Sequence, residues 1–290
     1  MNIIKELSEK SILKKDDSKK TKLLNKRYYC IEEIASGGLS IVYEGIDIYS
    51  EYFDIDSNLV IKIPNKELLT KSDIAAFVYS EYTFLRKLNL DTIVKVLDYG
   101  IDKKKNIPYL VLEKIHGKLL SETSIATMNI KDKNSIFKSL INTLSYIHSK
   151  NIIHADISPL NIIINDDFEP IIFDFGISQN INDNKDFSLE YNKVKAFNPK
   201  YCAPELLNDN TRPTISSDIF SLAAIMYEVY CNKPLFESSS KELFELPIEK
   251  RNLSEIPFFL RKWFKNALHI DVKKRKLLKN KIFFYKFNNY

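Results

Sequence analysis

Apolar and polar positions in the first part of the chain follow the pattern of short strands. From Tyr28 to Glu113, runs rich in β-branched and aromatic residues are separated by turn residues, which predicts a β-rich region. The expected strands cover residues 28–34, 41–48, 59–63, 93–100 and 108–112.

Helical periodicity interrupts these strands once and dominates after Leu119. Residues 72–89 predict a helix that buries one apolar face and leaves Glu81 and Arg86 on the surface. The members of that face are Phe77, Phe84, Leu85 and Leu88. Two later apolar stripes consist of Ile136, Leu140, Ile141, Leu144 and Ile147, and of Ile219, Leu222, Ala223, Met226 and Val229. The pattern therefore predicts a β-rich lobe followed by a helical lobe, joined near residues 113–117.

The composition is that of a chain with a packed core. Its 290 residues are 44% hydrophobic, with only 6 Gly and 10 Pro, which excludes a low-complexity or disordered chain. No apolar run approaches the roughly 20 residues of a membrane span, and the N-terminus lacks the apolar segment of a secretory signal. The spacing of the 3 cysteines fits neither a disulfide framework nor a zinc site. We expect a cytoplasmic protein, with a secreted effector that lacks a signal peptide as the alternative.

Charge is distributed unevenly along the chain. Residues 1–27 carry a net charge of +5 and residues 261–290 a net charge of +9, so residues 28–260 carry −9. A nucleic-acid reader more often has a basic face within its folded part. We therefore expect solvated basic ends and no specific nucleic-acid partner, with a phosphate-binding patch as the less favoured reading.

Two features of the β-rich region suggest a site for phosphate groups. The turn Ala35-Ser36-Gly37-Gly38 lies between two expected strands and offers little steric hindrance, although a simple hairpin explains two glycines equally well. Lys62 lies within an apolar strand, and a buried ammonium needs an anionic partner, for which Glu81 is the candidate. The alternative is that Lys62 reaches solvent at a strand edge.

Further motifs occur in the helical region. They are Ile153-His154-Ala155-Asp156-Ile157-Ser158-Pro159-Leu160-Asn161, Phe173-Asp174-Phe175-Gly176, Tyr201-Cys202-Ala203-Pro204-Glu205, Ser217-Asp218-Ile219-Phe220-Ser221-Leu222 and Asp271-Val272-Lys273-Lys274-Arg275. With the glycine turn and Lys62, this ordered set resembles eukaryotic-like (Hanks-type) protein kinases, most closely the bacterial Ser/Thr protein kinases. The resemblance covers about residues 28–276.

The resemblance implies an α+β, bilobal protein-kinase-like fold. A small β-rich N-lobe would cover residues 28–113, and the hinge and a larger helical C-lobe would cover residues 114–276. A basic N-terminal extension, residues 1–27, would precede this domain, and a basic and aromatic tail, residues 277–290, would follow it.

The resemblance also implies roles for individual residues in binding ATP and Mg²⁺ or Mn²⁺. Lys62, oriented by Glu81, would bind the α- and β-phosphates, and Asp156 would accept the proton of the substrate hydroxyl. Asn161 and Asp174 would hold the metal ions. The nucleotide would contact the loop residues Ala35, Ser36, Gly37 and Gly38, the adenine-flanking side chains Val42, Val60 and Ile163, and backbone groups of Glu113 and Ile115, with Leu112 as gatekeeper.

Several residues match supporting positions of the family. Glu205 and Arg275 would form a buried ion pair, and Asp218 would anchor the catalytic loop. The apolar stack that links the lobes in the family would consist of Leu85, Val96, His154 and Phe175.

The chain departs from the family pattern at five positions. Ala35 and Ser40 replace glycines of the phosphate loop, which is tolerable if their φ angles are negative. Ala155 replaces an arginine that reads a phosphate on the activation loop, so control by loop phosphorylation is not expected. Ser158 replaces a lysine that touches the γ-phosphate, and Asn198 replaces a threonine near Asp156, which predicts low activity or an unusual acceptor.

The leading interpretation is an ATP-dependent Ser/Thr protein kinase that also phosphorylates itself, on hydroxyls such as Ser178, Ser188 and Tyr191. A pseudokinase or scaffold is the first alternative, supported by the substitutions Ala155, Ser158 and Asn198. A small-molecule kinase is the second, and it would require a substrate pocket after Asp218. The sequence indicates neither the protein substrate nor the oligomeric state.

Overall fold

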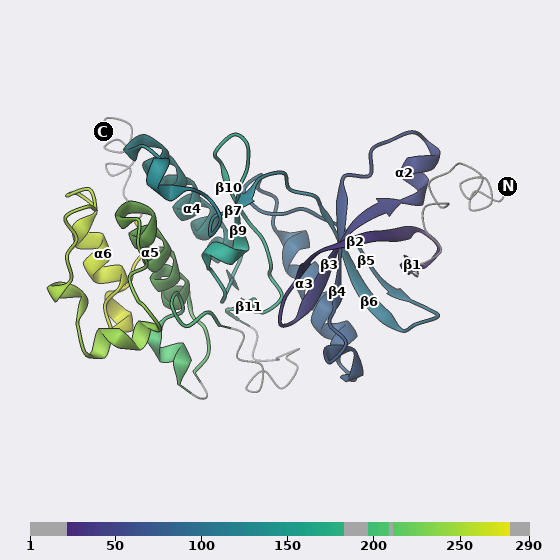
Figure 1. The fold of residues 1–290 in the computed structure, drawn as a ribbon. Coiled ribbons are helices and arrows are strands. Elements are labelled where there is room, and N and C mark those ends of the chain that lie inside the picture. The colour runs from purple at the N-terminus through teal and green to yellow at the C-terminus, as the bar shows by residue number, and fades with distance from the viewer. Residues whose placement is uncertain (1–21, 183–196, 209–210, 279–290) are drawn as a thin grey trace. The chain divides into compact units, whose positions relative to one another are not determined.

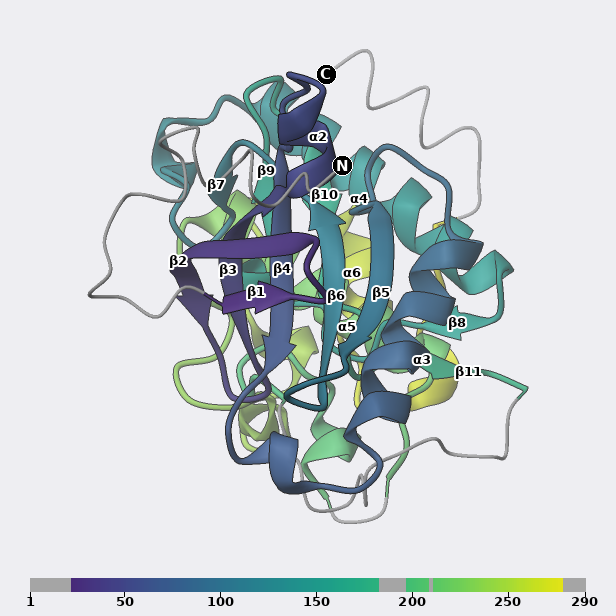
Figure 2. The same cartoon turned by 90° about the vertical axis from the view of Figure 1, so that its right-hand side faces the viewer.

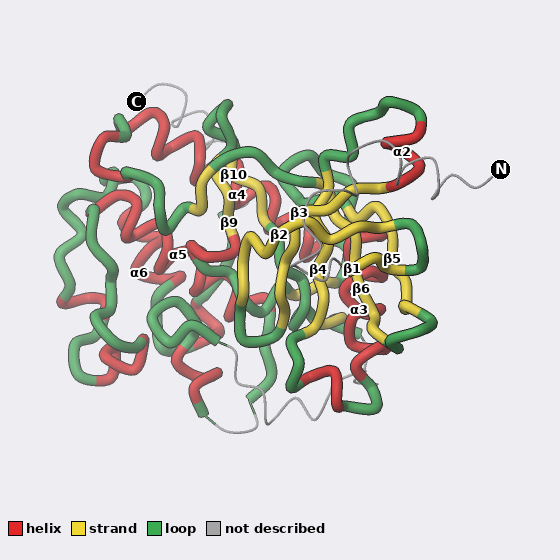
Figure 3. Tube along the Cα trace, turned by 45° about the vertical axis from the view of Figure 1, so that its right-hand side comes forward, coloured by secondary structure: helices red, strands yellow, loops and turns green. Residues whose placement is uncertain are grey.

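A strand-rich part and a helix-rich part follow one another along the backbone, as the colours of Figure 3 show. The computed structural model describes residues 22–182, 197–208 and 211–278. These residues form two units. The first comprises residues 22–86 and 95–114, and the second comprises residues 87–94, 115–182, 197–208 and 211–278.

The first unit is built on one six-stranded sheet, in the order β1-β2-β3-β4-β6-β5 (Figure 2). Every neighbouring pair of strands is antiparallel. The strands are β1 (Lys22–Leu24), β2 (Tyr28–Ser36), β3 (Ser40–Asp47), β4 (Leu59–Pro64), β5 (Val96–Asp102) and β6 (Ile107–Glu113). The helices are α2 (Ile48–Tyr52), the 3₁₀ turn η1 (Leu68–Thr70) and α3 (Ile74–Lys87).

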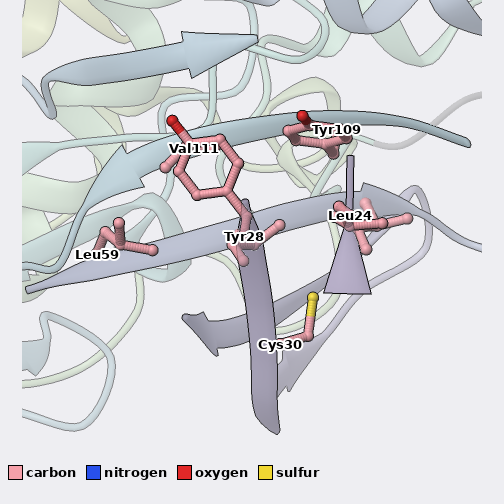
Figure 4. Close-up of a cluster of buried hydrophobic side chains, with 8 residues drawn as sticks. Leu24, Tyr28, Cys30, Leu59, Tyr109 and Val111 are labelled. Atoms are coloured by element: carbon pink, nitrogen blue, oxygen red, sulfur yellow. The ribbon is translucent and has the colours of Figure 1, made fainter. Parts of the chain in front are cut away.

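Alternation along β4 separates the core face of this sheet from its opposite face. Leu59, Ile61 and Ile63 are buried, whereas Val60 and Lys62 are half-buried and point the other way. The core face is shown in Figure 4, and its buried members are Leu24, Tyr28, Cys30, Leu59, Ile61, Ile63, Tyr109 and Val111. The sheet therefore presents Lys62 on the face opposite its apolar core.

Strand β1 lies before the expected start of the domain at residue 28. It pairs with β2, and the side chain of Leu24 is fully buried in the core cluster. Arg27 donates hydrogen bonds to Asp47 and Asp98. Residues 22–27 thus add a strand and an ion-pairing arginine to the sheet of the first unit, which the sequence pattern did not predict.

Two expectations for this region need correction. The strand expected over residues 93–100 begins only at Val96, because residues 92–94 belong to the second unit, where their backbone bonds to Ile172. Glu81, expected on the surface of its helix, is only 3% exposed. The apolar face of α3 includes this carboxylate because Lys62 neutralises it.

The second unit combines three principal helices with short strands (Figure 1). The helices are α4 (Ile130–Ser149), α5 (Ile215–Cys231) and α6 (Arg261–Ala267). The strands are β7 (Lys118–Leu119), β8 (Ile152–Ile153), β9 (Ile162–Ile164), β10 (Pro170–Ile172) and β11 (Gln179–Asn180). They form one three-stranded sheet, β10-β9-β7, and one two-stranded sheet, β11-β8.

Helix α5 is the centre of the second unit and packs against both α4 and α6. Thr214 caps its N-terminus in a capping box with Ser217, and Asn232 ends it in a left-handed conformation. Both apolar stripes predicted from the sequence are confirmed, since every member is at most 2% exposed.

Within the part of the chain that the structure describes, no helix combines the length and the apolar character needed to cross a membrane.

Candidate active site

The first unit contributes an ion pair to the candidate site. Lys62 on β4 donates from Nζ to both carboxylate oxygens of Glu81 on α3, each at 2.8 Å. The two side chains are 11% and 4% exposed, so little water separates the charges. This is the partner that the sequence predicted for a lysine in an apolar strand.

The turn between β2 and β3 places its backbone in an open position. Gly37 donates to the carbonyl oxygen of Ser40 at 2.9 Å, and both Gly37 and Gly38 are exposed. A Cβ atom on Gly38 would meet nothing within 4 Å, so the protein itself leaves the space over this residue open. Neither Ala35 nor Ser40 has a positive φ, which confirms that both tolerate the loss of glycine.

Strand register brings the predicted adenine-flanking residues of the first unit together. Val42 lies opposite Lys62, and Val60 lies opposite Leu112. Paired residues of antiparallel strands point to the same face, so these side chains lie on the face opposite the apolar core.

The end of β6 limits which backbone groups can face a nucleotide. The N–H of Glu113 donates to the carbonyl oxygen of Lys95 at 3.0 Å, so the carbonyl of Glu113 is the backbone group of this residue that could accept a hydrogen bond from a ligand. In the second unit, Ile162 and Ile164 are buried while Ile163 is half-buried and points the other way. Ile115 is half-buried in the same unit.

The second unit contributes the loop that carries Asp156 and Asn161. The amide nitrogen of Asn161 donates to the backbone oxygen of Asp156 at 2.8 Å and to its carboxylate Oδ2 at 2.7 Å. The bond to the backbone oxygen positions the Asn161 amide, and the bond to Oδ2 orients the Asp156 side chain. They also identify which end of the Asn161 amide is oxygen, because only nitrogen can donate to a carboxylate.

The same unit holds two residues that fit a magnesium ion. Fixing the Asn161 nitrogen on Asp156 leaves its amide oxygen as a donor to a hard cation. Asp174 has a left-handed backbone, with φ of 62°, and its Oδ1 accepts from the N–H of Gly176 at 3.2 Å. Among the described residues, no group of three or more His, Cys, Asp and Glu could hold a metal. One carboxylate and one amide suit Mg²⁺, which keeps waters and takes substrate phosphates as its other ligands.

The loop that carries Asp156, called the catalytic loop in the family, contains a strained residue that Asp218 supports. Ala155 has φ of 72°, a conformation that costs a non-glycine residue on the order of 1 kcal/mol or more. The Asp218 carboxylate, 1% exposed, accepts from the backbone N–H groups of His154 and Ala155, each at 2.9 Å. It also bonds His148 Nε2 at 2.9 Å. These bonds to a buried carboxylate hold the strained turn in place.

His154 is a buried structural residue. Its Nε2 lies 3.1 Å from the carbonyl oxygen of Phe173, and its Nδ1 accepts from the N–H of Asp156. A carbonyl partner requires N–H at Nε2, so the ring is the neutral Nε2–H tautomer. The ring also packs on Phe175, with centroids 4.6 Å apart. His154 therefore links the backbone around Asp156 to the segment that carries Asp174.

The expected ion pair of Glu205 and Arg275 is present. Arg275 Nη1 donates to Oε1 of Glu205 at 2.6 Å, and Nη2 donates to Oε2 at 3.0 Å. Arg275 is only 3% exposed, and its guanidinium lies 4.8 Å from the ring centroid of Phe220 on α5. Nearby Cys202 is buried, and this burial, with the charges of Asp156 and Glu205, raises the pKa of its thiol to about 12.

The substituted positions supply no positive charge. Ser158 is 2% exposed and accepts through its backbone from the N–H of Asn161. Asn198 accepts through its side chain from the N–H of Lys200 and through its backbone from Tyr201 and Cys202. Both polar residues are therefore part of the local backbone framework.

One of the hydroxyls predicted to be phosphorylated is not accessible. Ser178 is 8% exposed and donates to the backbone oxygen of His154 at 3.0 Å. Ser178 is therefore a poor candidate for self-phosphorylation, because its hydroxyl is buried and bonded to the loop that carries Asp156. Ser188 and Tyr191 lie outside the described residues.

Two contacts near the site were not foreseen from the sequence. Lys114 pairs with Glu44 at 2.5 Å, which ties the end of β6 to β3. Asn65, directly after β4, bonds to the phosphate loop. Neither contact involves a residue of a recognised motif. The sequence signal at Asn65 is its place after Pro64, which indicates a turn but not a contact with the loop.

Comparison with known proteins agrees with this geometry. The family model described as protein kinase domain matches residues 28–281. The carbon catabolite-derepressing protein kinase of Candida glabrata is 26% identical over 77% of this chain and 34% of its own length. The probable serine/threonine-protein kinase MARK-C of Dictyostelium discoideum is 32% identical over 63% of this chain and 23% of its own.

A bacterial protein kinase has a similar sequence identity to this chain. The serine/threonine-protein kinase PknL of Mycobacterium tuberculosis is 28% identical over 77% of this chain and 54% of its own length. The chain thus spans between about a quarter and about half of the length of these relatives.

Proposed function

Because the chain belongs to the protein kinase family, we propose that it transfers the γ-phosphate of ATP to serine or threonine hydroxyls of proteins. The observation that carries the proposal is the hold of Asn161 on Asp156, which orients a carboxylate and a metal-binding amide oxygen together. The printed names of the bacterial and eukaryotic relatives support Ser/Thr specificity.

The nucleotide would be bound mainly by residues of the first unit. Lys62, held by Glu81, supplies positive charge to the α- and β-phosphates, and the open backbone at Gly37 and Gly38 allows phosphates to approach. In the first unit, the groups that we assign to adenine are the side chains of Val42 and Val60 and the carbonyl of Glu113. In the second unit, considered by itself, the assigned groups are the side chain of Ile163 and the backbone of Ile115.

Asp174 and Asn161 would hold Mg²⁺. When bound, the ion neutralises charge on the phosphate oxygens. The chain's own contribution is to present oxygen donors in fixed positions: Asp174 through its left-handed backbone and Asn161 through its bond to Asp156.

Asp156 would position the acceptor hydroxyl and take its proton. The Asp156 carboxylate, which Asn161 orients through Oδ2, is the group that we assign to the hydroxyl.

We expect slow phosphoryl transfer because Ser158 stands where the family has a lysine. The family's lysine at this position touches the γ-phosphate, whereas a buried serine adds no charge there. Loss of one positive group costs roughly 10²–10³-fold in rate in comparable electrostatic sites. We also propose a cytoplasmic location, where ATP and conditions that keep Cys30, Cys202 and Cys231 as thiols occur together.

Incubation with labelled ATP, Mg²⁺ and dephosphorylated casein tests the proposal. We expect label on serine or threonine of casein, identified by phosphoamino-acid analysis. Asp174→Ala should remove this incorporation, because it deletes the carboxylate assigned to the metal. Asp167→Ala is the matched control, since Asp167 is an exposed carboxylate in the β9–β10 turn of the same unit.

Calorimetry with ATP separates the alternatives. ATP binding without transfer, in the intact chain, would favour the scaffold interpretation over the proposed function. Equal incorporation by the intact chain and Asp174→Ala would overturn the site assignment.

A further inference from the structure

Asn65 ties the tip of the phosphate loop to the segment that leads into α3. Its side-chain nitrogen donates to the carbonyl oxygen of Gly38, and its backbone N–H donates to the carbonyl oxygen of Leu39 at 3.1 Å. Its side-chain oxygen accepts from the N–H of Leu68 at 3.0 Å, and its backbone oxygen accepts from Leu69. One residue therefore joins the loop to η1.

An apolar contact runs beside these hydrogen bonds. The half-buried side chain of Leu39 packs against a cluster of Leu68 and Ile74, together with Phe77. Ile74 and Phe77 belong to the first turn of α3, the helix that carries Glu81. The tip of the phosphate loop and the start of this helix thus share one small apolar cluster.

The bonds to Asn65 also set the direction of a backbone donor. In a trans peptide the C=O and N–H groups point in opposite directions, and the described residues contain no cis bond. The carbonyl of Gly38 points to Asn65, so the N–H of Leu39, in the same peptide unit, points away from it. Backbone N–H groups directed out of a turn are the groups that bind phosphate oxygens.

The loop's own sequence does little to fix this orientation. Gly37 and Gly38 have wide conformational freedom, and the β2–β3 ladder that supports them contains two irregularities in register. Within the hairpin, the Gly37–Ser40 hydrogen bond restricts the loop, and the contacts with Asn65 from outside the hairpin restrict it further.

We propose that Asn65 is a positioning residue for the nucleotide, which, with Leu39, holds the phosphate loop in register with the Lys62–Glu81 pair. This rests on the proposed function, since it names the residue that preorganises the ATP-binding loop. A loop that is already ordered loses less entropy when a nucleotide binds. Loosening it should weaken ATP binding more than it slows transfer.

The variant Asn65→Asp removes only the side-chain N–H group that donates to the carbonyl oxygen of Gly38. Aspartate has nearly the same shape and retains an oxygen for the N–H of Leu68, but it places a carboxylate oxygen against the Gly38 carbonyl. The matched control is Asn25→Asp in the β1–β2 turn of the same unit. Asn25 likewise accepts a backbone N–H, from Lys103, and donates to a backbone carbonyl, of Ile101. Its left-handed backbone, with φ of 46°, suits aspartate as well.

Two measurements are made on the full-length chain and both variants. The first is hydrogen–deuterium exchange of residues 36–41 without nucleotide, which we expect to be faster in Asn65→Asp and unchanged in Asn25→Asp. The second is steady-state kinetics, in which Asn65→Asp should raise the KM for ATP by about three- to tenfold, the effect of one hydrogen bond, with kcat within about twofold. Leu39→Ala should raise KM in the same way, and Leu39→Met should restore it.

The outcomes distinguish this proposal from the proposed function. Unchanged exchange in residues 36–41, or equal KM effects in Asn65→Asp and Asn25→Asp, would overturn the role of Asn65. A loss confined to kcat would do the same. Failure of the unsubstituted chain to bind ATP would overturn the proposed function, and the positioning role with it, whatever the exchange of the loop.

Discussion

Lys62 and Glu81 place opposite charges where both side chains are largely buried. Each charge is tolerated because the other is within 2.8 Å, and removing either one leaves its partner in a poorly hydrated position. If Lys62 binds phosphate as we propose, stability and phosphate binding depend on the same two residues.

We predict that Lys62→Met abolishes transfer and also lowers stability. Loss of the phosphate-binding ammonium should cost roughly 10²–10³-fold or more in kcat/KM. The Glu81 carboxylate left behind should reduce the free energy of unfolding by about 3 kcal/mol, measured by urea denaturation.

The double variant Lys62→Met/Glu81→Met separates the two effects. Replacing both charges by apolar side chains should restore most of the stability but none of the transfer. If the single variant retains transfer, Lys62 does not bind the nucleotide.

Asp156 and Asp174 should fail in different ways. Asp156→Asn retains an oxygen for the Asn161 amide, so ATP affinity should stay within about threefold while turnover falls roughly 10²-fold or more. Asp174→Asn should instead weaken Mg²⁺-dependent ATP binding, measured by calorimetry. The reverse result, with ATP binding lost only in Asp156→Asn, would mean that the two roles are exchanged.

Sequence reasoning could identify most residues of the candidate site, but not the conformations that hold them. Motif order located Lys62, Asp156 and Asp174 because each residue type is tied to its chemistry. The left-handed backbone of Ala155 has no local signal, since alanine does not favour positive φ. It is imposed by Asp218, a residue 63 positions away, and so becomes visible only in the folded chain.

At the scale of the elements, α5 connects several parts of the second unit. It supplies Asp218 to the catalytic loop and Phe220 to the face of Arg275, and its own ends are closed by Thr214 and Asn232. A change in the contacts of this helix should therefore reach the catalytic loop.

We predict that Arg275→Met destabilises the protein by about 3 kcal/mol, measured as a lower midpoint of urea denaturation. Arg275 is almost fully buried and bonds both carboxylate oxygens of Glu205. Glu205→Gln should cost less, because the Glu205 side chain is 23% exposed and the amide keeps one acceptor. A larger loss in Glu205→Gln would contradict this account.

Long elements, whose apolar pattern repeats several times, were predictable from the sequence, whereas very short elements were not. The stripes of α4 and α5 extend over several turns, so their periodicity identifies both helices and their buried faces. Strand β1 has only three residues and no alternation to detect. Its place in the sheet depends on pairing with β2 and on the pocket that receives Leu24.

For the whole molecule, this short strand decides where the folded chain can begin. A chain that starts at Tyr28 lacks the fully buried Leu24 and the guanidinium that joins Asp47 to Asp98. We predict that its free energy of unfolding is lower than that of a chain that starts at Lys22. The difference should be about 2–5 kcal/mol or more, which is the usual cost of truncating a buried leucine side chain. Thermal denaturation of the two chains measures the difference, and equal midpoints would show that β1 contributes nothing.

Because Cys202 is buried, the rate at which its thiol is alkylated reports how often the surrounding segment opens. At neutral pH a thiol with a pKa of about 12 reacts slowly with iodoacetamide, because only the thiolate attacks. Its alkylation should thus proceed through conformations in which the segment near Glu205 has opened. We predict that Arg275→Met accelerates the labelling of Cys202, followed by mass spectrometry, while the half-buried Cys231 of α5 serves as an internal reference. Equal acceleration at both cysteines would indicate global unfolding, so a ratio of two rates reports how independently this segment moves.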